Sequence, residues 1–208
     1  MDIKAIFFDA GNTLIFIDPH VVLPILKEHG ADTDLEGLKE AEFHARTHLV
    51  RRVEDGAWGT ENHIWKEYFA NLFLEAGVPE DRVEKVGERI REVHRDRHLW
   101  THVPEGMADT LRTLRDAGYR LGVVSNADGR MRDVIQDGGL LDLLEFVVDS
   151  EEEGVEKPDP EIFLRACRRM GLPPEACLYV GDLYPVDVLG AQDAGLRAVL
   201  LDPLDRLD

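Results

Sequence analysis

The chain has 208 residues, of which 44% are hydrophobic and 32% are charged. This length suits one large domain or a core with a smaller insertion, and the composition fits a soluble globular protein and gives no reason to invoke disorder. The net charge of −18 argues against a nucleic-acid or anionic-membrane partner, because surfaces that bind phosphate backbones carry an excess of Lys and Arg.

The N-terminal segment MDIKAIFFDAGNTLI has an acidic residue at position 2 and only a short apolar run. It therefore predicts neither a signal peptide nor a membrane span, and we expect a cytoplasmic protein. Cys167 and Cys177 are the only cysteines, and neither has a His or Cys nearby at the spacing of zinc ligands. We expect both to be reduced structural thiols.

Five short apolar runs predict strands, at residues 5–8, 121–124, 146–148, 178–180 and 198–201. None of them alternates with polar residues, which is typical of strands that are covered on both faces of a parallel sheet. Helical spacing over 104–117, 160–170 and 186–194 separates the later runs, and a glycine follows each helix. This alternation predicts a doubly wound, Rossmann-like α/β core.

A different pattern follows the first strand, where roughly eighty residues have helical periodicity and no convincing strand. Helices are expected at about 21–29, 35–53, 61–76 and 80–99. We therefore predict a helical domain of residues 17–101, inserted into a core of residues 1–16 and 102–208. Trp58 fits core packing and a substrate-facing loop equally well. Five histidines of the insertion are expected to be solvated or packed rather than metal ligands: His44, His48, His63, His94 and His98.

Four of the predicted strands are followed by polar residues with catalytic potential, in the chain order Asp9, Ser125-Asn126, Lys157 and Asp182, with Asp187 close behind. Ligands of an open parallel sheet bind beyond the carboxyl ends of its strands, so we expect these side chains to share one pocket. Each of them singly has an ordinary explanation as a turn former or helix cap. Their joint order favours a functional site.

In this order the residues resemble the motifs of the haloacid dehalogenase superfamily, a group of hydrolases dominated by phosphatases. Asp9 to Thr13 is similar to its first motif, Ser125 to its second and Lys157 to its third, and GDLYPVD at 181–187 is similar to the GDxxxxD form of its fourth. The resemblance covers residues 1–16 and about 102–208. It implies that the helical insertion is the cap that many members carry between their first two motifs.

The resemblance also implies an activity, a cofactor and a set of roles. It implies a phosphatase that acts on a small phosphorylated substrate through an aspartyl-phosphate on Asp9, with Lys157 as a second catalytic residue. The implied cofactor is Mg²⁺, which suits a site made of oxygen ligands. Its implied ligands are Asp9, the carbonyl of Gly11, Asp182 and, directly or through water, Asp187. The implied phosphate-binding residues are Thr13, Ser125, Asn126 and Lys157.

Position 11 departs from the family pattern, in which the second residue after the nucleophile is an Asp that acts as general acid and base. Gly11 keeps the backbone carbonyl but lacks that carboxyl. General acid–base catalysis contributes about 10² to 10⁴ in rate, or roughly 3 to 5 kcal/mol of barrier. Three explanations are open: a substrate with a good leaving group, a proton from a cap side chain or water, or a silent member that binds a phosphometabolite or a protein partner.

Two other chemistries of the superfamily fit less well. Phosphonate-cleaving relatives also lack the second Asp, but they form a Schiff base on a cap lysine, and no cap lysine here has a local feature that marks it for this task. Dehalogenating relatives work without metal and carry a Ser-Ser-Asn type of fourth motif, whereas Asp182 keeps the metal-binding acid. The sequence leaves the physiological substrate and the oligomeric state open.

Overall fold

The chain divides into two compact units, one formed by Met1–Phe16 with Thr101–Asp208 and the other by Ile17–Trp100. A computed structural model describes residues 2–56 and 62–202 of these units, so Trp58 lies outside the described residues. The predicted boundaries follow residues 16 and 101, and those of the structure follow Phe16 and Trp100. We refer to the two units as the core unit and the helical unit.

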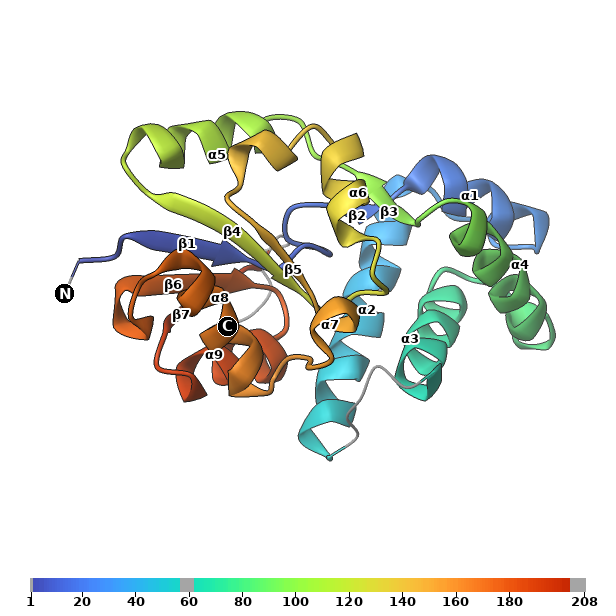
Figure 1. The fold of residues 1–208 in the computed structure, drawn as a ribbon. Helices are drawn as coiled ribbons and strands as arrows, with labels where there is room; N and C mark the ends of the chain where they lie inside the picture. Colours follow the sequence, from blue (N-terminus) through green and yellow to red (C-terminus); the bar gives the residue numbers. More distant parts are fainter. Residues whose placement is uncertain (1, 57–61, 203–208) are drawn as a thin grey trace. The chain divides into compact units, whose positions relative to one another are not determined.

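The core unit is built on a five-stranded parallel sheet in the order β5-β4-β1-β6-β7 (Figure 1). Its strands are β1 (Ala5–Phe8), β4 (Arg120–Ser125), β5 (Val147–Asp149), β6 (Cys177–Gly181) and β7 (Arg197–Leu200). Each of the five predicted runs forms one of these strands, and no end differs by more than one residue. The prediction of a doubly wound α/β core is confirmed.

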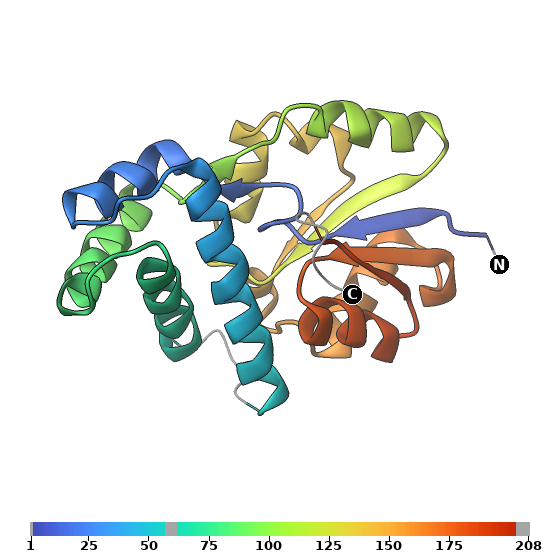
Figure 2. The ribbon, with the colours of Figure 1, turned by 180° about the vertical axis from the view of Figure 1, so that it is seen from behind.

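Helices cover both faces of this sheet. In both views α5 and α6 lie on one face and α8 and α9 on the other (Figures 1 and 2). The helices of the core unit are α5 (Met107–Asp116), α6 (Met131–Asp137), α7 (Ser150–Glu153), α8 (Pro160–Met170) and α9 (Leu189–Asp193), with 3₁₀ turns η2 (Leu141–Leu143) and η3 (Pro174–Ala176). Helix α8 has the predicted bounds: the Asp159 side chain caps its start and Gly171, at φ 68°, ends it. Its buried Phe163 packs edge-on against the ring of Tyr179 in β6.

The segment after β6 differs from the prediction of one α-helix over 186–194. The chain first forms a π-helical turn, η4 (Tyr184–Val188), and becomes α-helical only in α9. The Asp187 carboxylate accepts a hydrogen bond from the main-chain nitrogen of Leu183 at 2.9 Å. The main-chain nitrogen of Asp187 donates to the Leu183 carbonyl at 2.7 Å. The predicted α-helix was therefore wrong over its first turn, where the wider turn carries the inward-facing Asp187.

The helical unit consists of α1 (Pro19–Glu28), α2 (Leu35–Glu54), α3 (Asn62–Glu75), a 3₁₀ turn η1 (Glu80–Arg82) and α4 (Val83–Asp96). Asp18 joins its two ends, because its side chain accepts from the main chain of His20 and from Arg97, and its own nitrogen donates to the Leu99 carbonyl. Two short strands that the sequence did not predict, β2 (Phe16–Ile17) and β3 (Trp100–His102), pair where the chain passes between the units. Among the described helices none has the length and hydropathy required to cross a membrane.

Candidate active site

The strand register brings the predicted residues to one edge of the sheet. Phe8 of β1 is level with Val123 of β4 and Val180 of β6, and the main-chain nitrogen of Asp9 donates to the Val180 carbonyl at 2.9 Å. Asp9 therefore follows β1 directly, while Ser125 ends β4 and Asp182 follows β6. The chain runs from β1 to β4 and β5 on one side and to β6 and β7 on the other, so β1 borders the topological switch point of the sheet.

The loop after β1 is a tight turn. The main-chain nitrogens of Leu14 and Ile15 both donate to the carbonyl of Ala10 at 2.9 Å. The left-handed residue of this turn is Asn12, at φ 54°, and Gly11 is not among the described glycines with positive φ. Thr13 is buried, and its hydroxyl has no hydrogen-bond partner among the described atoms. A buried hydroxyl without a protein partner has a donor to offer to a ligand.

Lys157 is the centre of the site. Its ammonium nitrogen lies 2.7 Å from Oδ1 of Asp9, 2.7 Å from Oδ1 of Asp187 and 2.9 Å from the hydroxyl of Tyr179. An ammonium group has three N–H donors, so protein acceptors take all of them. Lys157 is buried, and a buried charge is tolerated only with such complete pairing. Its predicted contact with phosphate stays a prediction, because that contact requires it to release one of these bonds.

The main chain of Lys157 is fixed by Asn126. The Asn126 side-chain amide donates to the Lys157 carbonyl at 2.9 Å, and its side-chain oxygen accepts from the Lys157 nitrogen at 2.8 Å. These paired bonds join the loop after β4 to the loop that carries Lys157. The predicted hydrogen bond from Asn126 to phosphate stays a prediction. Because the Asn126 side chain is already bonded to Lys157, that bond would come from the Asn126 main-chain nitrogen.

Two residues that sequence reasoning missed hold the loop that follows Ser125. Asp149, at the end of β5, accepts from the main-chain nitrogens of Gly129, Met131 and Glu151 at 3.0 to 3.2 Å. Ser150 accepts from the Ala127 nitrogen at 3.0 Å. The sequence places an acidic residue and a serine at the end of a predicted strand, but ordinary helix caps have the same pattern.

Tyr179 is the third residue that sequence reasoning missed. It is the one phenol in the apolar run 177–181, and a buried phenol needs a hydrogen-bond partner.

The electrostatics follow from burial and close pairing. Burial raises the pKa of Asp9 to about 6; Lys157 opposes this rise and Asp187 adds to it. Burial also acts to lower the pKa of Lys157, but the Asp187 and Asp9 carboxylates outweigh it and hold that pKa above its ordinary value. Burial raises the pKa of Tyr179 as well. Lys157 is therefore a cation and Tyr179 a neutral phenol at physiological pH.

Three buried carboxylates of this site fit a divalent cation. Each of Asp9, Asp182 and Asp187 offers an oxygen, and these oxygens lie within 4.8 Å of one another. Oxygens on opposite sides of an octahedral Mg²⁺ with bonds of about 2.1 Å are about 4.2 Å apart. The donor set is all oxygen, and it carries a charge that Lys157 only partly compensates. These residues therefore suit Mg²⁺.

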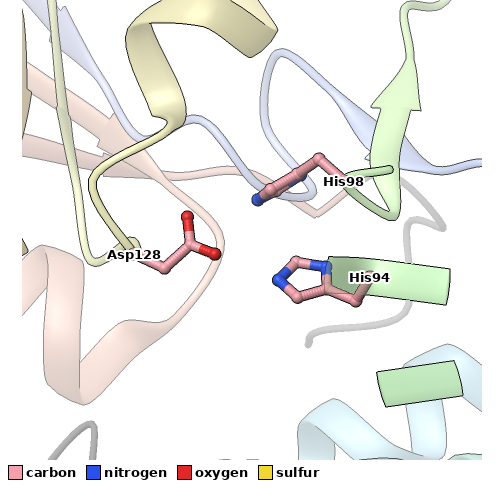
Figure 3. Close-up of side chains that lie close together, drawn as sticks. All are labelled: His94, His98 and Asp128. Carbon is pink, nitrogen blue, oxygen red and sulfur yellow. The ribbon is translucent and has the colours of Figure 1, made fainter. Parts of the chain in front are cut away.

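Figure 3 shows two imidazoles of the helical unit, His94 and His98, side by side; their ring centroids are 4.6 Å apart. Nδ1 of His94 accepts a hydrogen bond from the Leu99 main chain at 3.3 Å, which leaves the proton of a neutral His94 on Nε2. Both rings also pack against Trp100. The third labelled residue, Asp128, belongs to the core unit, where it pairs with Arg130.

Comparison with known proteins identifies the family. The model of the family described as haloacid dehalogenase-like hydrolase matches residues 3–195. Haloacid dehalogenase-like hydrolase domain-containing protein 3 of Mus musculus is 36% identical over 86% of this chain and 74% of its own length. Glyceraldehyde 3-phosphate phosphatase of Methanothermobacter thermautotrophicus is 42% identical over 96% of this chain and 86% of its own length.

Solved structures of this fold include another protein of similar architecture. The magnesium-bound structure of the HAD-hydrolase YfnB from Bacillus subtilis has a TM-score of 0.73 at 21% identity, and the match covers 100% of this chain and 90% of that one. At this identity the likeness concerns the fold alone. The family match over residues 3–195 shows that the chain belongs to the haloacid dehalogenase-like hydrolases.

Proposed function

We propose that this protein is a Mg²⁺-dependent phosphatase that hydrolyses a small phosphorylated metabolite through an aspartyl-phosphate on Asp9. The observation that carries the proposal is the buried Asp9 carboxylate, bonded to Lys157 and within 4.8 Å of carboxylate oxygens of Asp182 and Asp187. The 42% identical relative named glyceraldehyde 3-phosphate phosphatase supports a small phosphate ester as the substrate class.

The proposed metal ligands are Asp9, Asp182, Asp187 and the main-chain carbonyl of Gly11. Three carboxylates face one ammonium here, so the group has an excess of two negative charges that one divalent cation neutralises. Bound Mg²⁺ would supply the positive charge that lets an anionic carboxylate approach an anionic phosphoryl group. Asp187 also accepts from Lys157 and from the Leu183 main chain, so its orientation is fixed from two sides.

In the proposed reaction an Asp9 oxygen bonds to phosphorus as the bond from phosphorus to the leaving oxygen breaks, and the leaving oxygen takes up a proton. A water molecule then attacks the phosphorus of the aspartyl-phosphate, which releases inorganic phosphate and restores the Asp9 carboxylate. Thr13, Ser125 and the main-chain nitrogen of Asn126 would donate to the nonbridging oxygens. The partnerless Thr13 hydroxyl supports this role.

A second candidate function rests on Gly11. Without the family's acid–base carboxyl, this chain would bind a phosphometabolite or a protein partner and turn substrate over very slowly or not at all. The two candidates differ in one measurable respect, namely whether Asp9 supports Mg²⁺-stimulated turnover.

An Asp9→Asn variant tests the proposal. With an aryl phosphate as substrate, we expect it to lose Mg²⁺-stimulated hydrolysis by on the order of 10³-fold or more, because the amide is not a nucleophile. The matched control is Asp116→Asn, on the exposed surface of α5, which should keep the wild-type rate. Turnover is followed with MgCl₂ and with excess EDTA, and a phosphometabolite panel that includes glyceraldehyde 3-phosphate and acyl phosphates then ranks substrates.

Equal Mg²⁺-stimulated rates for the wild type and Asp9→Asn would contradict a nucleophilic Asp9. If the wild type turns over no member of the panel but binds inorganic phosphate in a calorimetric titration with Mg²⁺, the binding function is the correct one.

A further inference from the structure

Tyr179 has a place in this site that the family motifs do not assign. It lies inside β6, is fully buried and belongs to the hydrophobic core of the unit. Its hydroxyl accepts from Lys157 at 2.9 Å and donates to the Val124 carbonyl at 2.8 Å. The phenol thus connects the ammonium group to β4, at the residue that precedes Ser125.

The direction of these two bonds is fixed. A phenol has one hydroxyl proton, and a main-chain carbonyl can only accept, so Tyr179 donates that proton in its hydrogen bond to the Val124 carbonyl. The phenol oxygen therefore presents a lone pair to Lys157 and receives its third N–H. The other two N–H groups go to Asp9 and Asp187.

Position 179 also fixes the orientation of the ammonium group. The phenol oxygen takes the one N–H that neither carboxylate takes, so all three donors have a defined direction. Without the phenol oxygen, one buried N–H would lose its partner, and the ammonium would turn toward another acceptor. Any such turn changes the direction of its bond to Asp9, which sets where the carboxylate oxygens of Asp9 point.

We propose that Tyr179 is a positioning residue, whose hydroxyl holds the Lys157 ammonium in place as a bridge between Asp9 and Asp187. This inference rests on the proposed phosphatase function. The ammonium nitrogen joins Asp9, which follows β1, to Tyr179 in β6, and the phenol joins both to β4 at Val124. The inference predicts that removal of a single buried oxygen slows the reaction without weakening substrate binding.

The test uses two substitutions at one position. Tyr179→Phe removes the hydroxyl and keeps the ring that packs against Phe163, whereas Tyr179→Leu removes both. We expect kcat for an aryl phosphate with Mg²⁺ to fall about 10- to 100-fold in both variants, the cost of a slightly misplaced reacting group, with KM within about twofold of the wild type. Tyr179→Leu should lower the midpoint of urea unfolding further than Tyr179→Phe does, because it loses the packed ring as well as the hydroxyl.

The matched control is Tyr68→Phe in the helical unit. Tyr68 is also buried, and its hydroxyl bonds to a carboxylate oxygen of Glu42 at 3.0 Å. Loss of that hydroxyl should leave kcat unchanged. A readout that needs no turnover comes from NMR of the metal-free protein: the Lys157 ammonium protons should exchange with water slowly in the wild type and at least about tenfold faster in Tyr179→Phe.

Two outcomes would overturn the inference. One is a Tyr179→Phe protein with wild-type kcat and wild-type exchange of the Lys157 protons. The other is a fall in kcat that follows the loss of stability, large in Tyr179→Leu and absent in Tyr179→Phe. Failure of the proposed function is distinguishable from both, because it appears in the Asp9→Asn measurement while the proton exchange of Lys157 is read without substrate or metal.

Discussion

In the proposed reaction, position 11 would decide which leaving groups the enzyme can release. A phosphoryl transfer from an alkyl ester needs a proton on the departing oxygen, and Gly11 has no side chain to supply one. An aryl or acyl leaving group departs readily as an anion and needs that proton far less. If the proposed reaction is correct, the identity of this one residue would separate two classes of phosphate ester as substrates.

The substitution Gly11→Asp restores the missing carboxyl. We expect it to raise kcat/KM for glyceraldehyde 3-phosphate, an alkyl ester, by about 10²-fold, and that for an aryl phosphate by much less. Asn12, not Gly11, is the described residue of this turn with positive φ, so a side chain at position 11 meets no left-handed backbone. The measurement is the ratio of the two kcat/KM values.

Gly11→Ala is the control, because it adds a Cβ atom and no carboxyl. If neither substitution changes the ratio, another group already provides the proton. If Gly11→Ala changes it as much as Gly11→Asp, the effect comes from the added Cβ atom and not from the carboxyl.

At the scale of the elements, the junction of β6 with η4 has no room for a side chain at position 181. A Cβ atom added at Gly181 would lie 2.4 Å from Cγ of Asp187, so Gly181→Ala must displace that carboxylate. We expect Mg²⁺ affinity, measured by calorimetric titration, to fall about 10- to 100-fold. Gly87→Ala in α4, where an added Cβ meets nothing nearer than 3.4 Å, is the control. It should keep the affinity and stabilise its helix by about 0.5 to 1 kcal/mol. Unchanged affinity in Gly181→Ala would argue against Asp187 as a ligand.

The sequence predicted the strands of the core unit because each is a continuous apolar run between turn residues. It also placed Asp9, Ser125 and Asp182 at one sheet edge, since parallel strands end together. It did not show what holds them. Tyr179 meets a lysine 22 residues away, and Asp149 meets main-chain nitrogens 18 to 20 residues away. Such pairings depend on strand order, which a single sequence does not display.

Short or irregular elements escaped the same reasoning. Strands β2 and β3 span two and three residues, too few for any period to appear. The π-helical turn η4 is decided by where the Asp187 carboxylate must point, and not by the apolar spacing around it. The prediction was therefore accurate where burial alone determines structure, and it failed where a polar contact does.

At the scale of the whole molecule, the net charge of −18 would repel a dianionic substrate as it approaches the protein. Raising monovalent salt from about 10 to 150 mM shortens the Debye length from about 30 to 8 Å and screens this repulsion. At fixed free Mg²⁺ we expect kcat/KM for a phosphate ester to rise about two- to fivefold over that range. A neutral osmolyte at the same osmolarity should have no effect. A fall with salt would show that a local positive field dominates the approach.

The bonds of Asp18 have a consequence for how such a chain can carry its insertion. Because Asp18 bonds to Arg97 and to Leu99, the helical unit starts and finishes at almost the same point. A disordered insertion of this length would cost roughly 3 kcal/mol more in loop-closure entropy than a four-residue turn when the sheet folds. The bonds of Asp18 hold the two ends of the helical unit together and remove most of this entropic cost. For the folding of the sheet, the whole insertion therefore acts as a short loop. A core of this kind can therefore carry a different inserted unit without a change in the fold of its sheet.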